Sequence, residues 1–200
     1  MSISLILASG SPRRKELLER AGITFKIEIP QNPEEVFLEE SPYDMVTRLS
    51  KNKAVEIFEK CSEQSLILSA DTTVIAPDSK QILNKPRDRN EAVEMIRMLN
   101  GAVHEVVTGY HLLETSSKEI KKEVSQVVTT KVHFVKLSES EIQSYVDLGE
   151  SMDKAGAYAA QGLGMVFIKE ITGSYTNVIG LPIAEVLSDL KNFGVNYFGK

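Results

Sequence analysis

The sequence has few cysteines and histidines and no long hydrophobic run. Its single cysteine, Cys61, excludes an intrachain disulfide, and His104, His111 and His133 are too scattered to indicate a zinc site. No apolar segment approaches the roughly 18 residues of a membrane-spanning helix. Residues 2–8 lack the basic start and the length of a secretion signal. We therefore expect a soluble protein of a reducing compartment, the cytoplasm, without a membrane partner.

The chain also lacks an excess of basic charge. Its 23 lysine and arginine residues stand against 28 aspartate and glutamate residues, which gives a formal net charge of −5. Because both signs are spread along the chain, no broad positive field is offered to nucleic acid or to an acidic membrane. We expect no nucleic-acid partner, and a polyanion that binds should do so in a local pocket.

Internal repeats, low-complexity tracts and a long glycine- and serine-rich linker are absent as well. Hydrophobic residues make up 42% of the 200 residues, a share that can furnish an ordinary buried core. The simplest interpretation is one continuous unit over residues 1–200. The chain contains no GxSxG, HExxH or GxxxxGK[ST] motif.

Strand-like and helix-like stretches alternate along the sequence. Strands are predicted at Ile3–Ala8, Leu66–Ala70, Gln81–Leu83 and Met165–Ile171, with a long antiparallel hairpin at Val103–Val135. Helices are predicted from Pro12 to about Ala21, from Pro42 to about Lys60, after Asp88, after Ser138 to about Gly149, and from Pro182. The pattern indicates an α/β or α+β architecture with a mixed sheet.

Three cations, Arg13, Arg14 and Lys15, fill the first turn of the first predicted helix. Because the helix dipole already places positive charge at that end, the arrangement is unfavourable without an anion. Free backbone N–H groups, the Ser9 hydroxyl and the small Gly10 would suit a phosphate or triphosphate. Alternatively, the arginines point into water or pair with acids elsewhere in the chain.

Lys53 interrupts the apolar stripe of the second predicted helix. It lies four residues after Leu49 and four before Ile57, on the same face. Its ammonium group therefore either snorkels to the edge of the core or reaches a buried anionic ligand. We expect Lys53→Met to keep or raise thermal stability while activity falls sharply, because a buried charge is lost but the helix packing remains.

Asp71 follows an apolar run at the predicted carboxyl end of a central strand, with Thr72 directly after it. Open α/β sheets bind their ligands at such strand ends. A carboxylate there holds Mg²⁺ or accepts a proton from water, or else it only caps a turn. Glu34 and Glu35, in an earlier loop, are further candidates for a metal site unless they are simply solvated.

Two polar loops complete the candidates. Lys85 precedes Pro86 and is displayed on a rigid turn. Gln161 lies at the end of the glycine-containing segment 153–162. Such a loop allows a flat base to approach, and a glutamine amide can then form hydrogen bonds with the edge of the base. Alternatively, the glycines only mark turns.

Taken in order, these segments closely resemble the Maf family from Leu7 to about Leu190. The residues that carry the resemblance are Leu7-Ala8-Ser9-Gly10-Ser11-Pro12-Arg13-Arg14, Arg48-Leu49, Lys53-Ala54, Ala70-Asp71-Thr72, Lys85-Pro86, Gly101, His104, Thr108, Asp153 to Tyr158, Gln161-Gly162 and Val178 to Pro182. Ser69 and Asn84 stand where the family often has glycine. The resemblance implies a two-lobed fold akin to inosine triphosphate pyrophosphatase, with a long mixed central sheet and a cleft.

The resemblance also implies hydrolysis of a nucleoside triphosphate to the monophosphate and pyrophosphate, with Asp71 as the proton acceptor and a divalent metal as cofactor. With carboxylates but no cysteine or histidine cluster, that metal should be Mg²⁺ or Mn²⁺ rather than zinc. Glu34 or Glu35 is expected to support it together with Asp71. The residues expected to hold the triphosphate are Ser9, Arg13, Arg14, Lys53 and Lys85.

The branch of the family that acts on dTTP and UTP resembles this chain at Arg13, Thr72 and Gln161, whereas the 7-methyl-GTP branch departs at all three. A neutral glutamine amide can donate to a pyrimidine carbonyl and accept from its N3–H. We therefore expect dTTP and UTP as substrates, with CTP or 5-modified pyrimidine nucleotides in addition. The alternatives are a 7-methyl-GTP pyrophosphatase and a non-catalytic nucleotide-binding regulator of septum formation. Both a monomer and a homodimer are compatible with the sequence.

Overall fold

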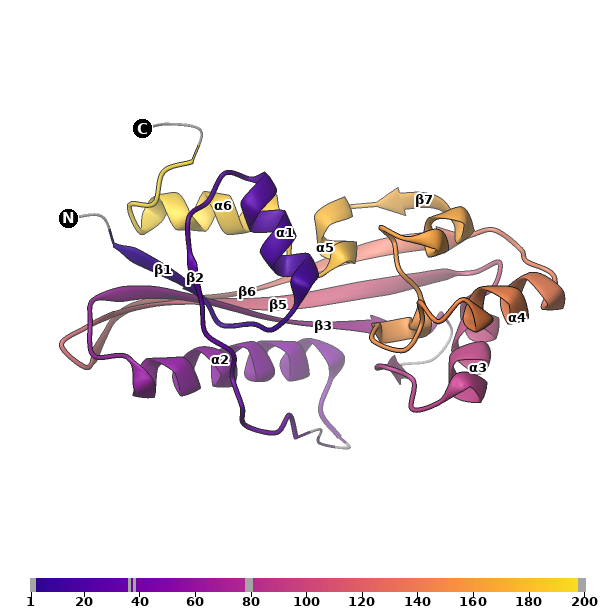
Figure 1. Cartoon of the computed structure of the whole chain (residues 1–200), viewed down its shortest axis with the longest axis horizontal. Coiled ribbons are helices and arrows are strands. Elements are labelled where there is room, and N and C mark those ends of the chain that lie inside the picture. The colour runs from indigo at the N-terminus through magenta and orange to yellow at the C-terminus, as the bar shows by residue number, and fades with distance from the viewer. Residues whose placement is uncertain (1–2, 36, 38, 78–80, 198–200) are drawn as a thin grey trace. The chain divides into compact units, whose positions relative to one another are not determined.

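The computed structural model describes residues 3–35, 37, 39–77 and 81–197 (Figure 1). Within these ranges the strands are β1 (Ser4–Leu7), β2 (Lys26–Ile27), β3 (Ser65–Ile75), β4 (Ile82–Leu83), β5 (Val103–Ser116), β6 (Glu119–Phe134) and β7 (Ile168–Thr172). The α-helices are α1 (Pro12–Arg20), α2 (Pro42–Lys60), α3 (Arg89–Leu99), α4 (Glu139–Asp147), α5 (Tyr175–Ile179) and α6 (Ile183–Asn192). Two short 3-10 helices, η1 (Ala155–Ala157) and η2 (Leu163–Phe167), precede β7.

The strands form one mixed sheet, which confirms the predicted class. Their order is β2-β1-β3-β5-β6-β7, with β4 pairing with β3. β1 is parallel to β2 and β3, whereas β3 with β4 and β6 with β7 are antiparallel pairs. The predicted hairpin is present as β5 and β6, and its turn residues Ser117 and Lys118 both adopt positive φ angles.

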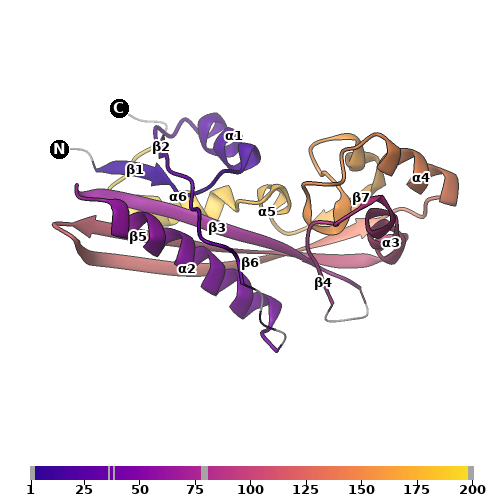
Figure 2. The same cartoon turned by 60° about the horizontal axis from the view of Figure 1, so that its bottom comes forward.

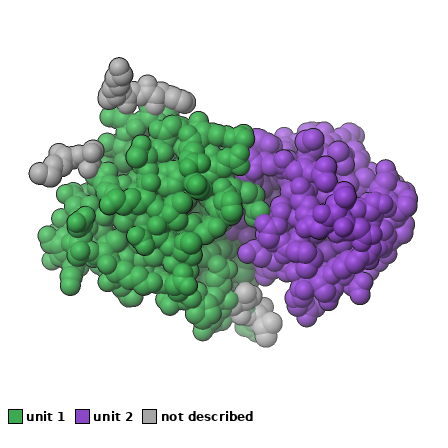
Figure 3. Space-filling view, in the orientation of Figure 1, with its two compact units in different colours: residues 1–71, 108–128, 180–200 green, residues 72–107, 129–179 purple. Residues whose placement is uncertain are grey.

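The chain divides into two compact units, each assembled from separate segments (Figure 3). Unit 1 comprises residues 1–71, 108–128 and 180–200, and unit 2 comprises residues 72–107 and 129–179. Strands β3, β5 and β6 each contribute residues to both units, so Asp71 is the last residue of its segment in unit 1 and Thr72 the first in unit 2.

In unit 1, helices cover both faces of the sheet. In the two ribbon views α2 lies along one face, and α1 and α6 lie on the other (Figures 1 and 2). A small core cluster joins β1, α2, β3 and β5 and includes Ile6, Ala54, Ile67 and Leu113. A Cβ atom at Gly109 would lie 2.5 Å from the carbonyl oxygen of Val46. Glycine in β5 therefore lets the backbone of α2 approach the sheet closely.

In unit 2, an aromatic core packs between the sheet and the helices α3 and α4. The rings of Phe134 and Tyr158 meet edge to face with centroids 4.8 Å apart. His104 Nε2 lies 2.8 Å from the Tyr158 hydroxyl, and burial lowers the pKa of this histidine to about 3. His104 is thus a neutral core residue, which confirms the interpretation that it is structural.

The predicted starts of α2, α3 and α4 are confirmed by their caps. Ser41 Oγ accepts a hydrogen bond from Asp44 N at 3.1 Å, at the start of α2. Asp88 caps α3 through Glu91 N at 2.9 Å. Ser138 and Glu141 form a reciprocal capping box at α4.

The structure differs from the prediction at two boundaries and in one additional helix. β3 runs on to Ile75, so Asp71 lies inside a strand rather than at its carboxyl end. The predicted strand Met165–Ile171 begins only at Ile168, because the residues before it form η2. α5 was not predicted. Among the described helices, none is long and apolar enough to cross a membrane.

Candidate functional site

The predicted residues Lys53, Asp71 and Glu34 lie together in unit 1. The Lys53 ammonium, on α2, lies 2.6 Å from Asp71 Oδ1 on β3 and 2.7 Å from Glu34 Oε1 in the loop before α2. The side chains of Lys53 and Asp71 are 14% and 12% exposed, whereas that of Glu34 is 54% exposed. One cation therefore neutralises one buried and one half-exposed carboxylate.

Neither interpretation of Lys53 included the ion pairs that the structure shows. The ammonium does not simply reach solvent at the edge of the core, since it bridges two carboxylates. Because the ammonium is paired with two acids, we revise the sequence-based expectation for Lys53→Met and expect the variant to be less stable. Removing the ammonium would leave Asp71 buried next to another acid, without the cation that compensates it.

The loop that carries Glu34 is attached to α2 at two further points. Glu56, only 5% exposed, accepts hydrogen bonds from the backbone N–H groups of Gln31 and Asn32 at 2.7 and 3.0 Å. Lys60 Nζ lies 2.6 Å from the same carboxylate. The hydrogen bond from Lys60, followed by those from the loop, lowers the pKa of Glu56 to about 2. Glu56 is therefore ionised at neutral pH.

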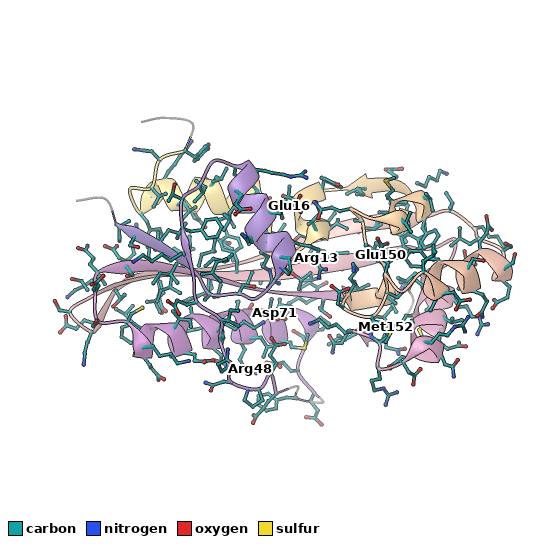
Figure 4. The ribbon with its side chains drawn as sticks, in the orientation of Figure 1. Arg13, Glu16, Arg48, Asp71, Glu150 and Met152 are labelled. Atoms are coloured by element: carbon teal, nitrogen blue, oxygen red, sulfur yellow. The ribbon has the colours of Figure 1, made fainter. Side chains whose placement is uncertain are left out.

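Arg48 contacts the other end of this loop (Figure 4). Its Nε donates to Glu40 at 2.7 Å, its Nη2 donates to the carbonyl oxygen of Glu35 at 2.9 Å, and its guanidinium lies 4.3 Å from the centroid of the Phe37 ring. The hydrogen bond to Glu40 raises the pKa of Arg48. The structure thus gives the Glu35 backbone a partner on α2, whereas the Glu34 side chain reaches Lys53.

Ser9 and Arg14 are joined by a hydrogen bond at the start of α1. Arg14 Nη1 donates to Ser9 Oγ at 3.1 Å, and its Nε donates to the carbonyl oxygen of Gly180 at 2.9 Å. Burial has the largest effect on the pKa of Arg14 and lowers it. The Asp71 carboxylate raises this pKa, the Arg13 cation lowers it, and the Glu34 carboxylate raises it. Arg14 therefore ties the Ser9 turn to the segment at Gly180 and lies within the field of both acids.

The first turn of α1 is as unusual in the structure as in the sequence. It contains no acidic residue, and the N-cap Ser11 makes no side-chain capping hydrogen bond. Arg13, at this turn, is half-buried (Figure 4). The positive end of the helix dipole and two arginines thus coincide, an arrangement that suits an anion.

The predicted metal ligands only partly come together. Glu34 and Asp71 converge on Lys53, but no group of three or more histidine, cysteine or acidic side chains in the described ranges forms a metal-binding cluster. Mg²⁺ in nucleotide enzymes is commonly held by one or two carboxylates plus substrate phosphates and waters. Two oxygen-donor side chains within the field of Arg14 at the start of α1 therefore fit Mg²⁺ or Mn²⁺.

The remaining predicted residues belong to unit 2. Thr72 on β3 and Gln161 before η2 are half-buried, and Lys85 is exposed. The turn after Gln161 is held by Glu150, which accepts from the N–H groups of Leu163 and Gly164 at 3.1 Å each (Figure 4). A Cβ atom at Gly162 would lie 1.8 Å from a Glu150 oxygen, so a larger residue here would displace this carboxylate from its N–H partners.

Sequence reasoning assigned no role to Glu56 or Glu150. Glu56 had a visible signal, since an acid three residues after Lys53 lies next to the apolar stripe of α2. Glu150 had none, because its partners are backbone N–H groups thirteen and fourteen residues away.

Comparison with known proteins gives a consistent result. A family model described as Maf-like protein matches residues 4–193. The dTTP/UTP pyrophosphatase of Thermoanaerobacter sp. (strain X514) is 44% identical over 189 residues, which cover 94% of this chain and 96% of that protein. The dTTP/UTP pyrophosphatase of Bacillus cytotoxicus is 45% identical over 188 residues, 94% of each chain.

One solved structure, a nucleoside-triphosphatase / dITP/XTP pyrophosphatase from Mycobacterium abscessus, aligns with 96% of this chain and 95% of its own. Its TM-score is 0.44 and its sequence identity 13%, so this likeness supports no conclusion.

Proposed function

Since this chain belongs to the Maf family, we propose that it is a nucleoside triphosphate pyrophosphatase that hydrolyses dTTP and UTP to the monophosphate and pyrophosphate. The observation that carries the proposal is the cluster of Glu34, Lys53 and Asp71, close to a helix start that carries two arginines. We further propose that residues 1–200 act as one Maf-type unit, located in the cytoplasm.

Asp71 is the residue best placed to accept a proton from the attacking water. In the reaction, the water oxygen bonds to the α-phosphorus while the bond from this phosphorus to the bridging oxygen breaks, and the electron pair leaves with pyrophosphate. The water proton goes to the Asp71 carboxylate. The pairing with Lys53 keeps this carboxylate in a fixed direction on β3.

The cations of unit 1 stabilise the negative charge of the triphosphate and of leaving pyrophosphate. We assign this role to Lys53 and Arg13, with Arg14 orienting the Ser9 hydroxyl through their hydrogen bond. An incoming polyphosphate competes with Glu34 and Asp71 for the Lys53 ammonium. Lys85 of unit 2 is assigned to the phosphates on the family resemblance.

Glu34 and Asp71 are the residues that would hold Mg²⁺ or Mn²⁺. A bound divalent ion supplies electrostatic screening of the phosphates and polarises them toward attack. Glu34 fits this role better than Glu35, because the Glu34 carboxylate reaches the ammonium that Asp71 also contacts.

Chelation should therefore abolish turnover. We expect pyrophosphate release from dTTP to stop in excess EDTA and to return with Mg²⁺ or Mn²⁺, because two acids and a triphosphate present hard oxygen ligands. Zinc should restore less activity than either ion. Full activity of thoroughly chelated enzyme would remove the metal from the mechanism.

The substrate panel tests the function itself. We expect kcat/KM for dTTP and UTP to exceed that for GTP and 7-methyl-GTP by about tenfold to a hundredfold, because a mismatched base leaves buried polar groups unpaired. The residues assigned to this choice are Arg13, Thr72 and Gln161. CTP and 5-modified pyrimidine nucleotides should also be hydrolysed.

Each result of the panel has a definite meaning. A preference for 7-methyl-GTP would overturn the base assignment but keep the pyrophosphatase. Nucleotide binding without pyrophosphate release from any member would favour a non-catalytic regulator.

A further inference from the structure

The loop that delivers Glu34 to Lys53 contains little regular structure. In the described residues from Glu28 to Glu40 there is no helix or strand. Glu34 itself is half-exposed, and its ion pair with Lys53 alone would hold it weakly, because exposed ion pairs contribute little. Arg48 holds the loop on the Glu35 side, so the side before Glu34 needs an anchor as well if the loop is to keep the 2.7 Å contact.

Glu56 is suited to this task by its position and its chemistry. It lies on α2, one helical turn beyond Lys53, so one rigid element presents both residues. Its buried carboxylate accepts from Gln31 N at 2.7 Å and Asn32 N at 3.0 Å. Two consecutive N–H groups bound to one ionised carboxylate form charge-assisted hydrogen bonds, which are stronger than neutral ones.

If Glu56 only stabilised α2, its hydrogen bonds to the loop would have no explanation. The carboxylate already has an ion-pair partner on its own helix in Lys60. Burying a carboxylate is costly unless every oxygen is satisfied, and here the loop satisfies both. Only Pro33 separates these hydrogen bonds from Glu34, so little freedom remains for the Glu34 backbone.

We propose that Glu56 is a positioning residue, which holds the loop through the N–H groups of Gln31 and Asn32 and thereby places Glu34 at Lys53 beside Asp71. The consequence for activity rests on the function proposed above. The consequence for the loop does not, because it is a property of the folded chain alone.

Hydrogen exchange resolved by NMR tests the loop directly. Gln31 and Asn32 lie between Pro30 and Pro33, which have no amide hydrogen, so these two amides report the anchored segment. In Glu56→Gln their exchange should be about tenfold faster or more, while amides of β1 keep their wild-type rates. Unchanged exchange at both amides would overturn the proposal, whatever the enzyme assay shows.

Two controls separate loop anchoring from helix stability. Lys60→Gln removes the ion pair of Glu56 but leaves both loop hydrogen bonds, so exchange at the two amides should stay within about twofold of wild type. Glu59→Gln alters a neighbouring exposed acid and should change nothing. If Glu56→Gln proves too unstable, Glu56→Asp keeps the charge on a shorter side chain and should still speed exchange at the two amides.

Activity provides the second readout. In Glu56→Gln the Mg²⁺ concentration for half-maximal activity should rise about tenfold, as it should in Glu34→Gln. In the double variant the rise should not be larger than in Glu34→Gln alone, because the two residues act through one contact. Additive effects, or a lower melting temperature with an unchanged Mg²⁺ requirement, would show that Glu56 only stabilises the fold. A wild-type chain without pyrophosphatase activity would refute the proposed function and leave the exchange result to decide the role of Glu56.

Discussion

Replacing Asp71 by asparagine should lower kcat by about 10²- to 10⁴-fold, the range that a positioned general base contributes. Asparagine has nearly the same size but cannot take up the water proton at neutral pH. The Asp71 side chain is 12% exposed and bound to Lys53, so the amide oxygen can keep that hydrogen bond and the strand should stay intact. The measurement is single-turnover pyrophosphate release from dTTP with metal and nucleotide saturating.

Binding distinguishes loss of catalysis from loss of the site. Asp71→Asn removes a negative charge near the proposed triphosphate site, so the Kd of a non-hydrolysable dTTP analogue, measured without metal, should stay the same or decrease. Glu63→Gln, which alters an exposed acid shortly before β3, is the matched control and should have wild-type kcat. Full turnover by Asp71→Asn would show that another group accepts the proton.

Helix starts and the hairpin were predictable from sequence because their signals are local. Ser41 and Asp88 each cap a helix through an N–H group three residues later, a spacing that can be read directly from the chain. The long hairpin needs only alternation and a polar turn. Such features depend on neighbouring residues, so tertiary packing does not alter them.

The extent of β3 was not predictable in this way. The polar sequence Asp71-Thr72-Thr73 interrupts an apolar run and normally favours a turn. In the structure Asp71 is compensated by Lys53, and the Thr73 hydroxyl lies 3.3 Å from the Asn84 side chain. The polar groups therefore have partners, and the strand continues to Ile75. Those partners are distant in sequence, beyond the reach of local patterns.

In the candidate site too, the local features were predictable from the sequence and the contacts between distant segments were not. Lys53, Asp71 and Ser9 were predicted as single residues of unusual type or position, but their mutual contacts were not. The bridging of Glu34 and Asp71 by one ammonium depends on how α2 packs against β3, which no spacing in the sequence reveals. An acid beside the apolar stripe of α2 is visible in the sequence at Glu56, but its role as loop anchor is not, since its partners are backbone N–H groups in another segment.

Lys53→Met should impair both stability and activity. Without the ammonium, the buried Asp71 carboxylate faces Glu34 without its counter-ion, which should destabilise the fold by about 1–3 kcal/mol. For a chain of this size each kcal/mol lowers the melting temperature by about 2–4 °C. The kcat/KM for dTTP should fall about 10²-fold or more, because a desolvated cation that faces the triphosphate is lost.

Lys51→Met provides the matched control for this change. Lys51 is two residues away on α2, and its ion pair with Glu123 is exposed, so its removal should cost less than about 1 kcal/mol and leave kcat/KM unchanged. The double variant Lys53→Met with Glu34→Gln should recover part of the lost stability, because one of the two facing carboxylates is gone, but none of the activity. Wild-type stability of Lys53→Met would mean that the ammonium compensates neither acid. Wild-type turnover would mean that it does not contact the substrate.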